Sequence, residues 1–243
     1  MAATVGKSAL LIGATGQTGQ QILRDLLQSP DFAKVGEYGR RVTDKSALPA
    51  SGIDKLVQRT IDFENLEEAG LKEHKWDVVF IALGTTKKVA GSAAAFEKID
   101  REYVVNAARG AKSDAPDQRL VYVSVDASSK FLYTRSKGLT ENALASLGYG
   151  DTIIFRPAFL AGTNRDSIRL GESIAALVLP IVSYFSNNAQ IDISTLAKSV
   201  VAAGKLGSAA LPASAMASQV GKNGASFTLI NNKGALALAS ETK

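Results

Sequence analysis

A strand-like segment that leads into three evenly spaced glycines constrains the fold more than any other feature. Leu10–Ile12 is a short apolar run of the kind found in central parallel strands that are buried on both faces. It is followed by Gly13, Gly16 and Gly19, and residues 20–27 continue with helical periodicity. This strand–turn–helix pattern is typical of a dinucleotide-binding turn, and an ordinary glycine-rich connection is the alternative.

Each glycine has its own physical role in such a turn. Gly13 permits the tight turn, Gly16 lets the backbone approach a pyrophosphate, and Gly19 lets the helix pack close to the strand. The pyrophosphate is expected on the N–H groups and positive dipole end of a helix that begins near Gln17. The predicted cofactor-binding residues of this segment are Gly13, Thr15, Gly16, Gln17, Thr18 and Gly19.

Composition excludes several classes of function. The chain of 243 residues contains no cysteine and one histidine, so we expect no thiolate or multi-histidine metal site and no histidine triad. The net charge of +5 is not gathered into a basic stripe, so nucleic-acid binding is not expected. No apolar stretch reaches about 18 residues, so no transmembrane span is expected.

Strand-like and helix-like segments alternate as far as about residue 160. After the first unit, strands are predicted at residues 35–39, 55–59, 77–83, 119–124 and 152–155, and helices at 93–111 and 133–147. This alternation predicts an α/β fold with a doubly wound parallel sheet, the Rossmann fold. We expect a single domain over residues 1–243, with a core at about 8–160. Residues 161–243 are expected to form a variable, small C-terminal substrate-facing lobe.

The C-terminal third shows weaker patterns. A helix is predicted at 192–205, a flexible surface insertion that can be partly helical at 204–226, and a last strand at 227–230 before a short helix. The apolar segment Ile174–Phe185 is expected to be core or a dimer surface, with a substrate lid or a peripheral membrane contact as alternatives. The oligomeric state stays open between monomer and dimer.

The end of the second predicted strand bears on which dinucleotide binds. NAD-binding turns commonly carry an acidic residue about 20 positions after the glycines, where it binds the ribose 2′-hydroxyl. Here Arg40 and Arg41 stand at the strand end, and guanidinium groups pair with a 2′-phosphate. NADP(H) is therefore expected, with two solvated arginines as the alternative. Asp62 and Phe63, after the third strand, are placed to meet the adenine, unless Asp62 simply ends the strand.

Tyr133 and Lys137 form a second chemical motif. On the predicted helix, residues four apart share a face, so the ammonium group can lie near the phenol. A nearby cation favours the phenolate and lowers the pKa of the tyrosine toward a value useful for proton transfer. A surface tyrosine above a helix-face lysine is the alternative.

Taken together, the glycine turn, Arg40-Arg41, Tyr133-x-x-x-Lys137 and Phe155-Arg156-Pro157 resemble the short-chain dehydrogenase/reductase superfamily. The glycine spacing matches its extended and atypical branches. The residues around Tyr133 are similar to the atypical group that contains a Tat-interacting tumour-suppressor oxidoreductase and fungal proteins of the mitochondrial outer membrane. The resemblance covers about residues 8–205.

The resemblance implies a role for several residues. Tyr133 would be the catalytic acid or base, and Lys137 would bind the nicotinamide ribose and bias the ionisation of that tyrosine. Pro157 would contact the nicotinamide carboxamide. The cofactor would also be lined by Leu83, Gly84 and Thr85.

The serine that holds the substrate oxygen in this superfamily maps to Ser124. The match is imperfect, because Ser124 is only nine residues before Tyr133, and Ser128 is the alternative. Asp100 occupies the helix position of the asparagine sometimes found in the proton relay.

The expected function is that of an NADPH-dependent oxidoreductase, of the carbonyl reductase or alcohol dehydrogenase type, acting on a small-molecule carbonyl or alcohol. The alternative is an NADPH-binding regulatory or sensor protein with little turnover, and an isomerase or epimerase is a third reading of the same residues. The resemblance implies a cytoplasmic location, or a peripheral one on the mitochondrial outer membrane.

Overall fold

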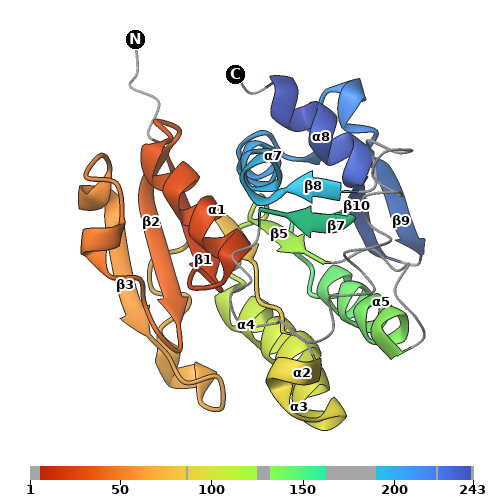
Figure 1. Ribbon diagram of the computed structural model, residues 1–243, viewed down its shortest axis with the longest axis horizontal. Helices are drawn as coiled ribbons and strands as arrows, with labels where there is room; N and C mark the ends of the chain where they lie inside the picture. The colour runs from red at the N-terminus through yellow and green to blue at the C-terminus, as the bar shows by residue number, and fades with distance from the viewer. Residues whose placement is uncertain (1–5, 86, 125–131, 163–189, 223, 242–243) are drawn as a thin grey trace.

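Eight strands form one sheet in the order β3-β2-β1-β4-β5-β6-β10-β9 in the computed structural model (Figure 1). The structure describes residues 6–85, 87–124, 132–162, 190–222 and 224–241. Neighbouring strands pair in parallel from β3 through to β10, and β9 pairs with β10 in the antiparallel direction. The reversal of strand order beside β1 is that of a doubly wound Rossmann sheet, which confirms the predicted fold class.

The sheet strands are β1 (Lys7–Ile12), β2 (Phe32–Gly39), β3 (Leu56–Thr60), β4 (Val78–Ile81), β5 (Arg119–Val123), β6 (Asp151–Arg156), β9 (Ser218–Lys222) and β10 (Ala225–Asn231). A small parallel pair consists of β7 (Phe159–Ala161) and β8 (Gln190–Asp192). The helices are α1 (Gln17–Gln28), α2 (Lys87–Ala90), α3 (Ala93–Glu97), α4 (Val104–Ala111), α5 (Leu132–Ala145), α7 (Ile193–Leu206) and α8 (Asn232–Glu241).

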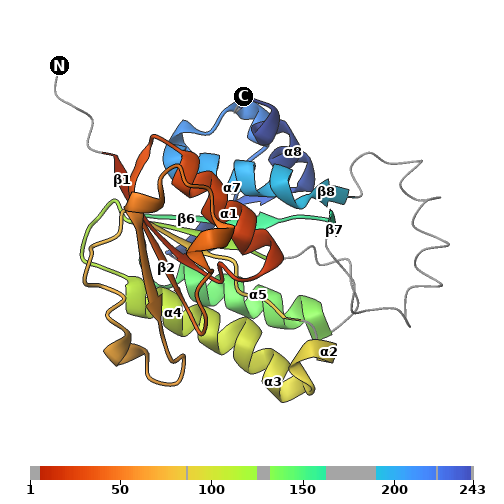
Figure 2. The same cartoon turned by 60° about the vertical axis from the view of Figure 1, so that its left-hand side comes forward.

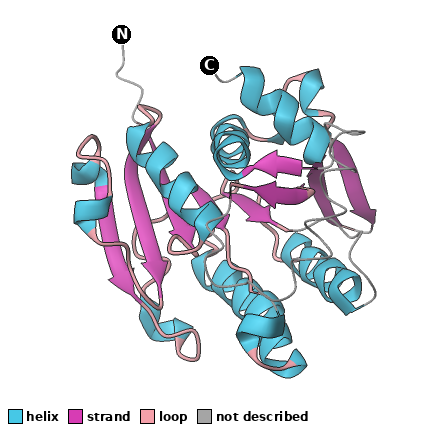
Figure 3. Cartoon of the chain, viewed as in Figure 1, coloured by secondary structure: helices cyan, strands magenta, loops and turns pink. Residues whose placement is uncertain are grey.

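Helices cover both faces of the sheet (Figures 2 and 3). Figure 2 shows α1, α7 and α8 on one side and α3, α4 and α5 on the other. Because both faces are covered, the central strands are continuously apolar rather than alternating, and all four residues of β4 are buried.

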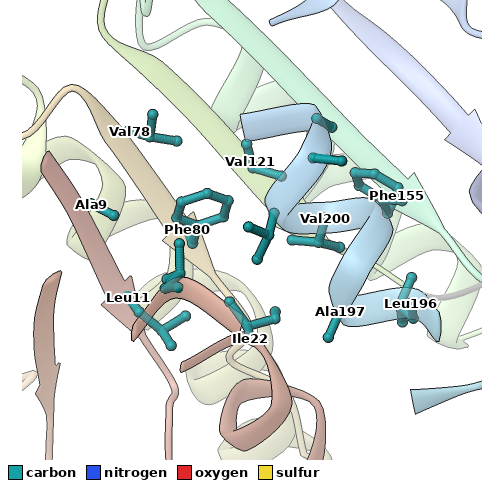
Figure 4. Close-up of a cluster of buried hydrophobic side chains, with 14 of the residues drawn as sticks. Ala9, Leu11, Ile22, Val78, Phe80, Val121, Phe155, Leu196, Ala197 and Val200 are labelled. Carbon is teal, nitrogen blue, oxygen red and sulfur yellow. The ribbon is translucent and has the colours of Figure 1, made fainter. Parts of the chain in front are cut away.

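One of the two hydrophobic clusters joins α1 and α7 to the sheet (Figure 4). Phe80, Val121 and Phe155 from three strands face Ile22 of α1 and Val200 of α7, and all five are fully buried. The described part of the C-terminal third therefore belongs to the main hydrophobic core. The division at residue 160 and the substrate-facing lobe stay predictions.

The predicted helix at 93–111 is continuous but changes its winding. A π-helical turn, Lys98–Tyr103, separates α3 from α4 and contains the fully buried Asp100. Such a turn inserts one residue into the helical register and is frequent at functional sites.

The expectation of a flexible insertion at 204–226 is wrong at its C-terminal end, whereas two short helical turns at Ser208–Ala210 and Ala213–Ala215 confirm that the segment is partly helical. Ser218–Lys222 is the edge strand β9, and Gln219 donates a side-chain hydrogen bond to Thr228 of β10 at 2.8 Å. The strand sequence has no apolar alternation, because β9 lies at the edge of the sheet, where Ser218, Gln219 and Gly221 are exposed. Ile174–Phe185 lies outside the described residues. None of the described helices combines the length and the apolarity that crossing a bilayer requires.

Asp25 of α1 is expected to make stability depend on pH. It lines a groove of about 500 Å³ beside Lys198, and its Oδ2 is buried without a hydrogen-bond partner among the described residues. Burial raises the pKa of this carboxyl to about 6, against the lowering effect of Lys198. The folded state therefore holds the proton where the unfolded chain releases it, so stability falls as pH rises from about 4 to about 6.

Asp25→Asn should therefore stabilise the fold at pH 7.5 by on the order of 1 kcal/mol, since solvent in the groove screens part of the penalty, and by much less at pH 4. Urea unfolding at both pH values measures this difference. Asp31→Asn in the same groove is the control: Asp31 pairs with Lys205 at 2.7 Å, so its removal brings no gain. An equal shift at both pH values for Asp25→Asn would contradict the prediction.

Candidate functional site

The predicted site residues gather at one edge of the sheet. Because β1 to β6 run in parallel, their carboxyl ends meet along a single edge, which is where ligands bind in open α/β sheets. The residues that directly follow these six strands are Gly13, Arg40, Ile61, Ala82, Ser124 and Pro157.

At two of the three positions of the glycine turn, contacts within the protein itself require glycine. Gly13 has φ of +96°, and a Cβ there would lie 2.7 Å from the carbonyl carbon of Ala82. A Cβ on Gly19 would lie 2.0 Å from the carbonyl oxygen of Gly13, so α1 packs against the turn at a distance that only glycine allows.

Gly16 differs from its two neighbours. Its φ of −75° suits any residue, and a Cβ would make only one contact, at 3.4 Å from the carbonyl oxygen of Gly13. Gly16 is exposed at the N-terminus of α1, which has no side-chain cap. The fold therefore does not demand glycine here, and the turn fits a pyrophosphate that approaches the backbone and the N–H groups of the first helical turn.

A hollow of about 60 Å³ brings the turn and the predicted specificity residues together. Its lining residues are Gly13, Ala14, Thr15, Gly39, Arg40, Arg41, Phe63 and Leu83. Arg40 and Arg41 are exposed, and neither forms an ion pair or hydrogen bond with any other described residue. Two free guanidinium groups thus stand beside the glycine turn.

Asp62 and Phe63 lie next to this hollow but act differently. Phe63 is 5% exposed, lines the hollow, and stacks on Tyr103 at a ring distance of 5.0 Å. The carboxylate of Asp62 accepts hydrogen bonds from the Glu64 N–H at 3.0 Å and from the Asn65 amide at 3.1 Å. Asp62 thus shapes the turn after β3, and its contact with adenine stays a prediction.

The loop after β4 is held from the opposite helix. Asp100 in the π-helical turn accepts a hydrogen bond from the Thr85 N–H at 2.8 Å, and its carboxylate is fully buried. Leu83 reaches the hollow at the glycine turn, and Gly84 is exposed beside it. Asp100 thereby fixes the backbone of the predicted cofactor-lining residues Leu83, Gly84 and Thr85.

Ser124 is committed to a buried network. It is 1% exposed, and its Oγ donates to Oε1 of Glu141 at 2.7 Å. Glu141, on α5, also accepts from Arg156 through Nε at 3.0 Å and Nη2 at 2.5 Å. In this arrangement the Ser124 hydroxyl points into an ion pair, so its role as the catalytic serine stays a prediction.

Tyr133 and Lys137 lie in the first part of α5, and their side chains fall outside the part of the chain that the structure describes. Glu141, four positions after Lys137 on the same helix, contacts the sheet residues Ser124 and Arg156. Ser128 also lies outside the described residues. Pro157 is buried directly after β6.

A larger hollow lies elsewhere. Its volume is about 600 Å³, and it is lined by Phe63, by residues of the segment 64–73 and by Asn106, Arg109 and Gly110 of α4. The smaller hollow is the candidate site, because it combines the glycine turn with unpaired cations at the carboxyl edge of the sheet. The described residues contain no group of three or more histidine or acidic side chains arranged to bind a metal ion.

Sequence reasoning missed two buried carboxylates at this edge, Glu37 and Glu141. Glu37 interrupts the apolar residues of β2 and is fully buried. A charged residue within an apolar strand, and an acidic residue four positions after Lys137, were the signals that could have identified them.

Comparison with curated proteins finds relatives along most of the chain. Protein HTATIP2 from Rattus norvegicus is 35% identical over 171 residues, which covers 70% of this chain and 69% of that protein. Mitochondrial protein FMP52 from Candida albicans is 34% identical over 184 residues, which covers 70% of this chain and 75% of the relative. No protein-family model matches the chain.

Solved structures share the fold at low sequence identity. The short-chain dehydrogenase/reductase YIR035C from Saccharomyces cerevisiae superposes with a TM-score of 0.60 at 17% identity, covering 82% of this chain and 90% of that one. WbmG from Bordetella bronchiseptica, solved in complex with NAD, gives a TM-score of 0.58 at 16% identity, covering 84% and 70%.

Alanine substitutions in the turn should separate a structural glycine from a ligand-facing one. Gly16→Ala should change the free energy of unfolding by less than about 1 kcal/mol but weaken dinucleotide binding by about tenfold or more, because its methyl group occupies the approach to the backbone. Gly19→Ala, the matched control, should cost at least about 2 kcal/mol because its Cβ overlaps the Gly13 carbonyl. Thermal unfolding and NADPH titration measure both quantities. Unchanged NADPH binding in a folded Gly16→Ala variant would refute the assignment of Gly16.

Proposed function

Because this chain belongs to the HTATIP2 and FMP52 family of atypical short-chain dehydrogenases/reductases, we propose that it is an NADPH-dependent oxidoreductase. Its substrate would be a small molecule with a carbonyl group to reduce or an alcohol to oxidise. The observation that carries this proposal is the pair of unpaired guanidinium groups of Arg40 and Arg41 beside the glycine turn.

Charge chemistry supports the choice of NADPH over NADH. The 2′-phosphate of the adenine ribose would lie at the carboxyl end of β2, within reach of Arg40 and Arg41. Arginine presents a planar array of donors that matches phosphate oxygens, and both side chains are exposed and available. Without that phosphate, two positive charges at adjacent positions would have no anion beside them.

Tyr133 and Lys137 would supply the proton chemistry. When bound, NADPH would supply the hydride for reduction, and NADP⁺ would take it up in the reverse direction. The Tyr133 hydroxyl would give a proton to the carbonyl oxygen as the alcohol forms, or accept one in the reverse direction. Lys137, one helical turn further along α5, would stabilise the phenolate and bind the nicotinamide ribose. Ser124 would hold the substrate oxygen only after release from Glu141, and Ser128 is the alternative for that role.

A second candidate function is that of a nucleotide-binding sensor with little turnover. The observation that favours it is the burial of Ser124 and the hydrogen bond that its hydroxyl donates to Glu141. In that case NADPH occupancy would alter partner binding, and Tyr133 would have no chemical role. The FMP52 relatives are mitochondrial proteins by name, which favours a mitochondrial location for either function.

Removing both arginines tests the cofactor assignment. Arg40→Ala with Arg41→Ala should weaken NADPH binding by roughly 10- to 100-fold, because charge-assisted hydrogen bonds to the 2′-phosphate are lost. NADH binding should be unchanged in the same variant. Calorimetric titration with both cofactors measures the two affinities. Equal affinity of the wild-type protein for NADH and NADPH would exclude the proposed selectivity.

Tyr133→Phe tests the proposed chemistry. Loss of the hydroxyl should lower turnover by about 100-fold or more while NADPH affinity is retained. NADPH absorbance in the presence of aldehydes, ketones and quinones measures turnover. Tyr149→Phe is the control, since that buried phenol donates to the Ala108 carbonyl at 2.6 Å, away from the carboxyl edge. A wild-type protein that binds NADPH but oxidises it with no substrate of the panel would favour the sensor.

A further inference from the structure

Glu37 is a charged residue buried inside the sheet. It lies on β2 between two strands, opposite Leu11 of β1 and Gln58 of β3, and it is 0% exposed. Val35, two positions earlier on the same face of β2, belongs to the cluster that packs against α1. A buried carboxylate is costly unless it is hydrogen-bonded, so its partners indicate why it is there.

Among the described residues, the side chain of Glu37 accepts hydrogen bonds only from Thr43, on the segment that follows β2, and from Gln58 on the neighbouring strand β3. Oε1 accepts from the Thr43 N–H and the Thr43 hydroxyl, each at 2.7 Å. Oε2 accepts from the Gln58 amide at 2.7 Å, and the same amide donates to the Thr43 carbonyl at 2.7 Å. Both polar groups of the Thr43 backbone and its side chain are therefore tied to Glu37 and Gln58.

These hydrogen bonds close a short loop whose tip carries the two arginines. Glu37 stands three residues before Arg40, and Thr43 stands two residues after Arg41. Fixing both ends restricts the backbone of the intervening residues. The guanidinium groups of Arg40 and Arg41 form no hydrogen bond or ion pair with another described residue. The hydrogen bonds of Glu37 thus order the backbone of the loop, while its guanidinium groups stay available to an anion.

The same contacts argue against a direct role for Glu37 in binding ribose. An acidic residue near the end of the second strand commonly accepts hydrogen bonds from the adenine ribose in NAD-binding turns. Here both carboxylate oxygens are already occupied, and no part of the side chain is exposed. Glu37 also does not line the hollow at the glycine turn.

We infer that Glu37 is a positioning residue for cofactor specificity, which clamps Thr43 so that Arg40 and Arg41 are preorganised to receive a 2′-phosphate. This inference rests on the proposed use of NADPH. Preorganisation matters because a loose loop would lose conformational entropy on binding, and that loss would subtract from the affinity. The clamp acts through the arginines alone and leaves binding of the rest of the dinucleotide unchanged.

Glu37→Leu removes every acceptor of the clamp while keeping a side chain of similar size on the face that α1 covers. NADPH affinity should fall at least tenfold, whereas NADH affinity should stay within twofold of wild type. The same substitution in a protein that already lacks Arg40 and Arg41 should change NADPH affinity by less than twofold, because the effect requires those side chains. Calorimetric titration of the four proteins with both cofactors completes the cycle.

Ser199→Ala is the matched control for loss of a buried polar contact. Ser199 on α7 is fully buried, and its hydroxyl donates to the Ala235 carbonyl. Its removal should lower stability without altering the ratio of NADPH to NADH affinity. If Glu37→Leu does not fold, Thr43→Val tests the clamp instead, because it removes a single hydroxyl from a half-buried residue. It should weaken NADPH binding about twofold to fivefold and leave NADH binding unchanged.

The outcomes separate this inference from the proposed function. If the wild-type preference for NADPH depends on the two arginines but NADPH affinity is undiminished in Glu37→Leu, or in Thr43→Val where Glu37→Leu does not fold, the clamp is refuted and the cofactor assignment stands. A parallel loss of NADH affinity would also refute the clamp, since it would indicate a ribose contact or general damage. A wild-type protein without preference for NADPH would overturn the cofactor assignment and the clamp together.

Discussion

The approach of α1 to the turn after β1 is the constraint on which the rest of the structure depends. It is possible only because Gly13 and Gly19 carry no side chain, since a Cβ on Gly19 would lie 2.0 Å from the Gly13 carbonyl oxygen. The short distance brings Ile22 into the apolar cluster between α1 and the sheet (Figure 4), and the N-terminus of α1 lies at the carboxyl edge because the helix directly follows β1. The packing of the core and the position of the candidate anion site therefore have the same cause.

Buried carboxylates then order the loops that surround this edge. Asp100 holds the Thr85 N–H, Glu37 holds Thr43, and Glu141 holds Ser124 together with Arg156. Each is at most 2% exposed, so each has exchanged water for hydrogen bonds within the protein. A rigid edge of this kind is what a binding site for a large, charged cofactor requires, because the loops need little further ordering when the ligand arrives.

Local sequence patterns predicted the central elements well. The apolar runs at β1, β4 and β6 and the helical periodicity of α1 and α7 survive in the structure, because strands and helices buried by neighbours on one or both sides have strong periodic signals. The edge strand β9 was missed, since Ser218–Lys222 pairs with β10 alone and is mostly exposed, so its side chains carry no apolar alternation. The π-helical turn was also missed, because a carboxylate such as Asp100 is expected on the exposed face of a helix, whereas the structure buries it.

The sequence alone determined the fold class, the position of the glycine turn and the family, because each depends on residues that are close together in the chain or evenly spaced. It also brought Arg40 and Arg41 to the end of a strand. Only the tertiary structure decided what the neighbouring carboxylates do. Glu37 of β2 accepts a hydrogen bond from Gln58 of the neighbouring strand β3, and Glu141 of α5 accepts one from Arg156 of β6. No local pattern could reveal either contact, because the partners are far apart in the sequence. Long-range pairing of buried charges depends on the register of the whole sheet, and that register exists only in the folded chain.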